Sequence, residues 1–263
     1  RSDALVAAET PFLDSLSAKG TLFLNAKNTG LSYSGPGWSG LLTGVREDKH
    51  GVLDNSFINS NFSEYPHIFK RVKDNYPNGK TVSVCQWHPI NDKIASGYVD
   101  SLINTENSTI DVQARSNREL EVENLTALFV HFDDVDASGH RYGFDPNNTN
   151  YTKAIENTDL AIGALLKKIK SRKNYLNENW AVIITTDHGG LGKRHGGFSD
   201  EERNIFIILS GGNLSDVRNN ALNSNCPPRL VDIFPTALNH LGITIEVEWG
   251  LDGVSLLSNS CEE

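Results

Sequence analysis

Residues 185–197 read TTDHGGLGKRHGG and place Asp187, His188 and His195 in a stretch that is otherwise small and rich in glycine. An apolar run at 180–184 precedes them, so these side chains follow a predicted buried strand. Carboxylate and imidazole groups are typical protein ligands of zinc. The alternative is a polar loop that happens to contain histidines.

A second group of the same kind lies in the run VHFDDVDASGHRYG, where Asp136 and His140 also follow an apolar segment. An Asp and a His four positions apart lie on one face of a helical turn. Taken alone this motif is weak, because a helix-capping Asp and a surface His give the same pattern. Two such groups, both after strands and both flanked by glycine, predict a metal site.

The five side chains are too many for one tetrahedral ion, and mixed His and carboxylate ligands without cysteine are more often catalytic than structural. We therefore expect two divalent metal ions that share a substrate oxyanion, and the ligand types favour zinc. The expected ligands are Asp136, His140, Asp187, His188 and His195.

A candidate nucleophilic hydroxyl group lies in the run SYSGPGWSGLLTGV at residues 32–45. A Gly-Pro-Gly turn follows Ser34 and precedes a short helix expected at 38–42, so Ser34 lies near a helix N-terminus, where an anion is favoured. A serine becomes a nucleophile only when a base or a metal lowers its pKa. N-capping is the plain alternative, and Ser32 and Ser39 are competing hydroxyls.

The elements that must position these groups alternate between strand and helix, which predicts an α/β fold with a mainly parallel central sheet and helices on both faces. Such folds bind ligands at strand ends. The expected strands are 21–26, 81–86, 125–132, 181–186 and 205–209, and the expected helices are 10–19, 62–72, 154–170 and 230–241.

The chain of 263 residues is expected to form one catalytic domain, in which the weakly patterned 88–124 stretch could form an inserted cap. The formal net charge of −9 argues against binding of duplex nucleic acid through a basic face. No apolar run is long enough to cross a membrane.

Sequons for N-glycosylation favour a secreted or extracytoplasmic location, which would be the periplasm in a bacterium. A disulfide between Cys226 and Cys261 is conceivable, but the sequence does not establish it. The sequons are at Asn61, Asn107, Asn124, Asn147, Asn150 and Asn213.

These motifs together resemble the alkaline phosphatase superfamily, particularly its nucleotide pyrophosphatase/phosphodiesterase branch. The resemblance covers nearly the whole chain, and motifs this numerous in this order are highly specific. It rests on TPFLDSLSAKGTLF at 10–23, SGPGWSGLLTGVREDKHGVLDN at 34–55, DASGHRYG at 136–143, TTDHGG at 185–190, VDIFPTALNHLGI at 231–243 and GLDGVSLL at 250–257.

The resemblance implies that Ser34 is the nucleophile and also a metal ligand, and that Asn55 donates to a phosphoryl oxygen. It implies that Asp187 and His188 bind the ion on the nucleophile side.

It also implies that Asp136 and His140 bind the other ion, with His195 as the last ligand there, at a position that varies across the superfamily. His50 corresponds to a structural histidine of the nucleophile segment.

One departure concerns the first strand. The family has an apolar strand ending in Asp-Gly immediately before the segment that corresponds to residues 1–5, and that Asp is a metal ligand. Either such a strand lies upstream of Arg1, or the site lacks one ligand, since Asp3 falls in the following turn.

The implied activity is metal-dependent hydrolysis of a phosphodiester or pyrophosphate bond in a small nucleotide-like substrate, through a covalent phosphoseryl or nucleotidyl-serine intermediate. A phosphomonoesterase is the nearest alternative and would need an extra cation, for which Arg46, Lys49 and Lys193 are available. A sulfatase fits less well, because Trp38 stands where the sulfatase signature has Arg. An inactive secreted relative that acts as a binding protein is the alternative from a different class.

Overall fold

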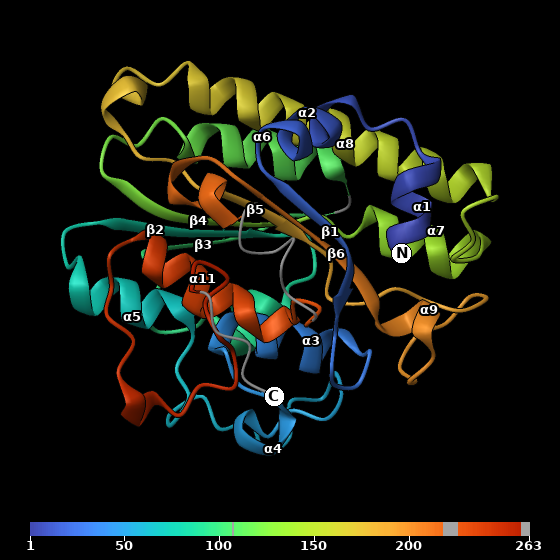
Figure 1. Cartoon of the computed structure of the whole chain (residues 1–263), viewed down its shortest axis with the longest axis horizontal. Helices are drawn as coiled ribbons and strands as arrows, with labels where there is room; N and C mark the ends of the chain where they lie inside the picture. Colours follow the sequence, from blue (N-terminus) through green and yellow to red (C-terminus); the bar gives the residue numbers. More distant parts are fainter. Residues whose placement is uncertain (107, 218–225, 259–263) are drawn as a thin grey trace.

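The computed structural model describes residues 1–106, 108–217 and 226–258, and its strands in these ranges form two three-stranded sheets (Figure 1). One sheet has the order β1-β6-β5, with β1 at Thr21–Lys27, β5 at Val182–Thr185 and β6 at Asn204–Ser210. The other has the order β3-β2-β4, with β2 at Lys80–Cys85, β3 at Ser101–Asn104 and β4 at Leu125–His131.

The strand directions differ between the two sheets. Strand β2 runs parallel to β3 and β4, whereas β6 runs antiparallel to β1 and β5. The α/β class is as expected, but a single, mainly parallel sheet is not observed in the described residues, where no ladder joins β4 to β5. Between β5 and β6 the chain has only a polar loop and the one-turn helix α9 (Asp200–Arg203), so no long crossover helix is present to return it in parallel.

Helices cover both faces of the sheets (Figure 1). On one face lie α1 (Ser2–Ala7), α2 (Pro11–Lys19), α6 (Thr109–Glu119) and α8 (Thr149–Lys170), and on the other lie α3 (Ser34–Thr43), α4 (Glu47–His50), α5 (Ile68–Asn75) and α11 (Ile233–His240). Helix α7 (Asp134–Tyr142) follows β4 and packs against α8. None of the helices in the described ranges has the length and apolar composition that a membrane span requires.

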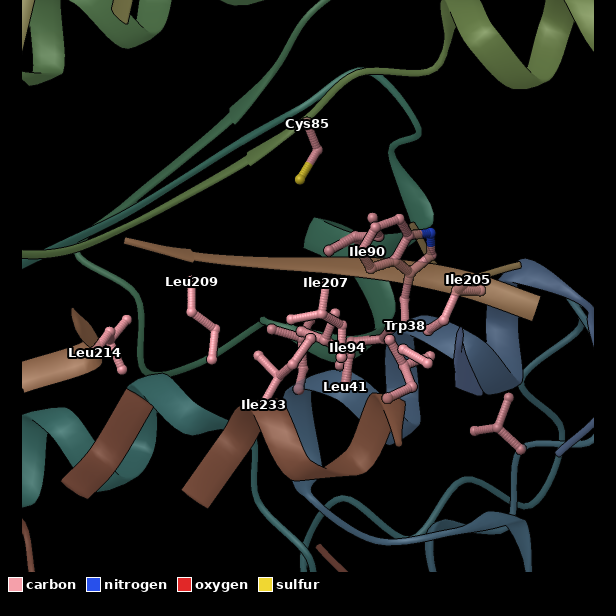
Figure 2. Close-up of a cluster of buried hydrophobic side chains, with 14 of the residues drawn as sticks. Trp38, Leu41, Cys85, Ile90, Ile94, Ile205, Ile207, Leu209, Leu214 and Ile233 are labelled. Atoms are coloured by element: carbon pink, nitrogen blue, oxygen red, sulfur yellow. The ribbon is translucent and has the colours of Figure 1, made fainter. Parts of the chain in front are cut away.

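Strand β6 supplies apolar side chains to both faces, as the two-residue period of a strand requires. Its Ile207 and Leu209 belong to the cluster that also contains Trp38 and Ile233 (Figure 2), whereas Ile208 packs with residues of α1, α2 and α8. Burial on both faces explains why β6 reads as a continuous apolar run.

Most expected elements are present with shifted ends, but the starts of two helices and the N-terminal segment differ from expectation. Helix α3 begins at Ser34 itself, so the Gly-Pro-Gly turn expected at 35–37 lies within the helix. A proline is tolerated in the first turn because the N–H groups there have no partner within the helix. The helix expected at 62–72 begins only at Ile68, and α1 was not expected. Residues 88–124 contribute β3 to the parallel sheet and α6 to a helix layer.

Helix α8 fixes the start of α2 through one buried carboxylate. Asp159 is fully buried and accepts hydrogen bonds from the backbone N–H groups of Leu13 (2.8 Å) and Phe12 (3.3 Å), which lie in the first turn of α2. Two N–H groups that have no partner within their own helix are therefore satisfied from another helix.

We expect Asp159→Ala to lower the free energy of unfolding by about 1–3 kcal/mol, because it leaves these buried donors without an acceptor. Urea denaturation monitored by circular dichroism measures the change, with Lys170→Ala on an exposed position of α8 as the control. Equal stabilities of the two variants would show that Asp159 does not stabilise the first turn of α2.

A buried histidine makes the fold sensitive to acid. His67 is 2% exposed and packs against the rings of Phe69 and Tyr98. Burial lowers the pKa of His67 from 6.5 to about 4. Protonation therefore favours the unfolded chain, so the stability that neutral His67 contributes is complete above pH 6.5 and is lost as the pH falls toward 4.

We expect the free energy of unfolding of His67→Gln to fall less steeply with acid than that of the unmodified protein. The two slopes should differ by up to one proton, or about 1.4 kcal/mol per pH unit. Urea unfolding at a series of pH values across this window measures the slopes, and His240→Gln is the control. Parallel curves for His67→Gln and the unmodified protein would contradict the assignment.

Candidate active site

Three chain segments meet at one end of the sheets. Residues that follow β4 supply Asp136 and, one turn later on α7, His140. Residues that follow β5 supply Asp187 and His188, and α3 presents Ser34 at its first position. Polar groups at the carboxyl ends of two strands are thus brought to the N-terminus of a helix, which is an anion-binding end.

Ser34 lies in contact with one of these groups. Its Oγ is 3.1 Å from Nε2 of His188, and the Nε2 of His188 is 3.3 Å from Oδ2 of Asp187. The Oδ1 atom of Asn55 accepts a hydrogen bond from the backbone N–H of Gly35 at 2.7 Å, which fixes this amide beside the serine.

Two glycines allow this close approach of α3. A Cβ at Gly35 would lie 2.5 Å from the carbonyl oxygen of Asp54, and one at Gly37 would lie 3.0 Å from Cβ of Asp187. A side chain at position 35 would therefore clash with backbone, and one at position 37 would press on Asp187, so these glycines let the helix N-terminus approach the strand ends.

Asp136, His140 and His195 form a second cluster whose ligand atoms lie within 4.8 Å of one another. The Nε2 atoms of the two histidines are 3.0 Å apart, and they lie 3.3 Å (His140) and 3.7 Å (His195) from the Asp136 carboxylate oxygens. The ring of His195 also stacks on that of His188 at 3.7 Å, so the two clusters are adjacent.

The hydrogen bonds of these rings favour a cation between them. Nδ1 of His140 is 2.9 Å from the carbonyl oxygen of Lys193, and Nδ1 of His195 is 2.7 Å from that of Ser32. Because a carbonyl oxygen only accepts, the neutral rings carry their hydrogens on Nδ1 and direct two Nε2 lone pairs at each other. An ion in this position would relieve that repulsion, and the carbonyls would orient the ligands.

The carboxylates of Asp136 and Asp187 also favour a cation at this site. Oδ1 of Asp136 and Oδ2 of Asp187 are buried and have no hydrogen-bond partner in the described part of the chain. Burial, helped by the charge of Asp136, raises the pKa of Asp187 to about 8. Burial also lowers the pKa of His188 and of His195. Buried carboxylates without partners and neutral histidines are the donor set that a divalent ion requires, so the residues fit metal ions.

Other residues considered from the sequence lie in supporting positions. His50 is buried, and its Nδ1 accepts from the N–H of Val52, consistent with a structural role. Trp38 is buried against the rings of Phe129 and His131, so it belongs to the core. Cys261, the conceivable disulfide partner of Cys226, lies outside the described residues.

The cations considered for the monoesterase alternative have partners elsewhere. Lys49 Nζ is 2.7 Å from Oδ1 of Asp252, and the Arg46 guanidinium is 4.0 Å from Oδ2 of the same residue. Lys193 Nζ donates to the carbonyl oxygen of Arg141 at 2.9 Å.

Sequence reasoning did not include two residues of this region. Burial, together with the charges of Asp136 and Asp187, raises the pKa of Asp133 to about 6. Asn28 donates through Nδ2 to the carbonyl oxygen of Asp187 at 2.8 Å and so fixes the end of β5. The carboxylates of the FDDVD run are a signal that could have drawn attention to Asp133, whereas Asn28 follows β1 and no pattern connects it to Asp187.

The chain is similar to curated enzymes over much of its length. It is 28% identical over 213 residues to the human bis(5'-adenosyl)-triphosphatase ENPP4, a match that covers 72% of this chain and 45% of that protein. It is 25% identical over 205 residues to rat ectonucleotide pyrophosphatase/phosphodiesterase family member 7, covering 69% and 45%. The chain thus spans about half the length of the curated relatives that it matches.

Solved structures share the fold. A putative sulfatase from Bacteroides thetaiotaomicron aligns with a TM-score of 0.72 at 15% identity, covering 94% of this chain and 68% of that one. Murine ectonucleotide pyrophosphatase/phosphodiesterase 5, solved as an inactive form with AMP, aligns with a TM-score of 0.57 at 21% identity, covering 72% and 54%. At these identities the likeness establishes the alkaline-phosphatase-like α/β fold alone.

A sequence model of the family described as type I phosphodiesterase/nucleotide pyrophosphatase matches residues 1–87 and 64–192, which together make up more than half of the chain. With the fold and the motif order in agreement, the chain belongs to the type I phosphodiesterase/nucleotide pyrophosphatase family.

Proposed function

We propose that the protein hydrolyses a phosphodiester or pyrophosphate bond in a small nucleotide-type substrate, with Ser34 as nucleophile. The observation that carries the proposal is the position of Ser34 Oγ at the N-terminus of α3, 3.1 Å from His188 Nε2 and beside both clusters of ligand residues. A hydroxyl in this position can attack an anionic phosphorus centre that the helix N-terminus helps to bind.

Two divalent ions, with zinc favoured, would be held by the two clusters. Asp187, His188 and Ser34 would hold one ion, and Asp136, His140 and His195 would hold the other. When bound, such ions would lower the pKa of a coordinated hydroxyl and neutralise charge on the phosphoryl oxygens.

In the proposed reaction, Ser34 and Asn55 have separate roles. The Ser34 hydroxyl gives its proton to water, and its oxygen forms a bond to phosphorus as the bond to the leaving oxygen breaks. The leaving oxygen takes a proton from water, so the protons balance. Water then cleaves the seryl ester, which releases the second product and restores the hydroxyl. The Nδ2 group of Asn55, whose Oδ1 atom is held by the N–H of Gly35, would stabilise the charge on the phosphoryl oxygens.

The partners of the nearby cations support a diester or pyrophosphate over a monoester. A monoester carries a third non-bridging oxygen and a second negative charge. Of the cations considered for it, Lys49 pairs with Asp252, Lys193 donates to the carbonyl oxygen of Arg141, and Arg46 lies 4.0 Å from Asp252. A nucleotide-type substrate is supported by the printed activity of the human relative and by the AMP bound to the murine one.

Tyr33 is the aromatic residue best placed to contact a base. It precedes the proposed nucleophile, is 38% exposed, and its ring lies edge-on to His195 at 6.4 Å.

The sequons support a secreted or extracytoplasmic location as part of the same proposal. Asn124, Asn147 and Asn150 lie at exposed positions, as glycosylated residues must.

Hydrolysis of a nitrophenyl phosphodiester and of the matching phosphomonoester tests the proposal. We expect zinc-dependent cleavage that prefers the diester and a loss of at least about a thousandfold in kcat for Ser34→Ala, because the nucleophile is removed. Ser63→Ala, at an exposed position, is the matched control and should retain full activity.

A preference for the monoester would move the assignment to a phosphatase. Absence of activity on both esters in a folded, zinc-loaded protein would favour the inactive binding relative instead.

Metal binding provides a test that does not depend on turnover. We expect His140→Ala to weaken one zinc site at least about tenfold in a calorimetric titration, because it removes a ligand from the cluster of Asp136, His140 and His195. His240→Ala, outside the site, should bind zinc as the unmodified protein does. Equal titrations for His140→Ala and the unmodified protein would exclude this cluster as a zinc site.

A further inference from the structure

Ser32 is a buried serine that the proposed reaction does not use. It is wholly buried, although it lies only two residues before the proposed nucleophile Ser34. Its Oγ donates a hydrogen bond to the carbonyl oxygen of Gly197 at 2.9 Å and accepts one from the backbone N–H of Gly196 at 2.8 Å. Because its one hydrogen is engaged and solvent does not reach it, Ser32 is not available as a nucleophile.

The backbone of Ser32 contacts the same loop. Its carbonyl oxygen lies 2.7 Å from Nδ1 of His195, so Ser32 holds each of the three consecutive residues 195–197 through one hydrogen bond. The contact leaves the Nε2 lone pair of His195 directed at Nε2 of His140, 3.0 Å away. One residue thus orients a candidate zinc ligand and also fixes the path of the chain that follows it.

Glycine at position 196 allows this close approach of the loop. The φ angle of Gly196 is +117°, in the range that favours glycine, and a Cβ there would lie 2.4 Å from the ring of Tyr33. The Glu202 carboxylate accepts from the N–H of Gly197 at 2.8 Å. The loop is therefore held by Glu202 and by residues 32–33, and the Ser32 hydroxyl joins it to the segment of the nucleophile.

That segment leads directly into α3. The carbonyl oxygen of Tyr33 accepts from the N–H of Gly37 in the first turn at 3.0 Å. Ser34 is the first residue of α3, and its Oγ lies 3.1 Å from Nε2 of His188. Because consecutive Cα atoms are held about 3.8 Å apart, a displacement of Ser32 would also displace the nucleophile.

We propose that Ser32 is a positioning residue, which fixes the nucleophile Ser34 relative to the candidate zinc ligand His195. It contacts neither the substrate nor an ion in this role. A phosphoryl group would be held between the two clusters of ligand residues, so a small change in their separation would be costly for the reaction. The effect on catalysis rests on the proposed function, whereas the effects on the ring of His195 and on zinc binding do not require turnover.

The plain alternative is that the hydrogen bonds of Ser32 only stabilise the fold. Ser83 provides the matched control, because it is also wholly buried and its Oγ donates to Oδ1 of Asn91 at 2.6 Å, in β2 and outside the site. Ser32→Ala and Ser83→Ala each remove one buried hydroxyl. A general loss of stability would therefore appear in both variants, and only an effect of Ser32→Ala beyond it concerns positioning.

Nitrogen-15 NMR of the metal-free protein reads the ring of His195 directly, at a pH of about 8, where imidazoles are neutral. We expect the ring to carry its hydrogen on Nδ1 in the unmodified protein and in Ser83→Ala. We expect a mixture of the two tautomers in Ser32→Ala, because the loop that follows the ring is no longer held.

Zinc titration and kinetics complete the comparison. We expect Ser32→Ala to weaken one zinc site at least about tenfold by calorimetry, whereas Ser83→Ala should bind zinc as the unmodified protein does. On a nitrophenyl phosphodiester we expect the kcat of Ser32→Ala to fall at least about tenfold while KM changes less than about threefold, because Ser32 does not contact the substrate. If Ser32→Ala fails to fold, Ser32→Cys takes its place, since a thiol forms only weak hydrogen bonds.

A mixed tautomer, weakened zinc binding and a lowered kcat in Ser32→Ala but not in Ser83→Ala support the proposal. Equal tautomers and equal zinc binding in the two variants would overturn it, as would equal kcat values in an active protein. If the unmodified protein has no activity, the proposed function fails, and the tautomer and the zinc titration then decide the proposal by themselves.

Discussion

The burial of carboxylates without hydrogen-bond partners is the constraint on which this site depends. Asp136 and Asp187 each keep one buried oxygen without a donor, and removing such charges from water is costly unless a cation or a proton compensates. Burial, together with the charge of Asp136, raises the pKa of Asp187 to about 8, which shows how strongly the site disfavours an uncompensated charge there. The energetic cost of burying these carboxylates must be offset, and the binding of positive ions between them would offset it most directly.

The surrounding structure maintains the arrangement through backbone contacts more than through side-chain pairs. Carbonyl oxygens orient the imidazoles of His140 and His195, Asn28 fixes the backbone at Asp187, and glycines let the N-terminus of α3 approach the strand ends. Helix α3 therefore places the proposed nucleophile, while the candidate ligand residues lie on α7 after β4 and on the loop after β5.

The sequence was sufficient for the local features and for the composition of the site. Apolar runs predicted β1, β2, β4, β5 and β6 but not β3, and helical periodicity predicted α8. Polar residues after β4 and β5 predicted the candidate ligand residues, of which Asp136, His140 and His195 lie together. The start of α3 was missed, because Gly-Pro-Gly is typical both of a turn and of the first turn of a helix. The sheet was expected to be continuous, but strand pairing depends on contacts distant in sequence, which local periodicity does not encode.

Trapping the covalent intermediate tests the central claim, that Ser34 is the nucleophile of this site, most directly. The protein would be quenched with acid during turnover of a nucleotide phosphodiester, digested with a protease, and its peptides examined by mass spectrometry. The account predicts a nucleotidyl group on the peptide that contains Ser34, attached at that residue. A group on another side chain, or turnover without any adduct, would contradict it.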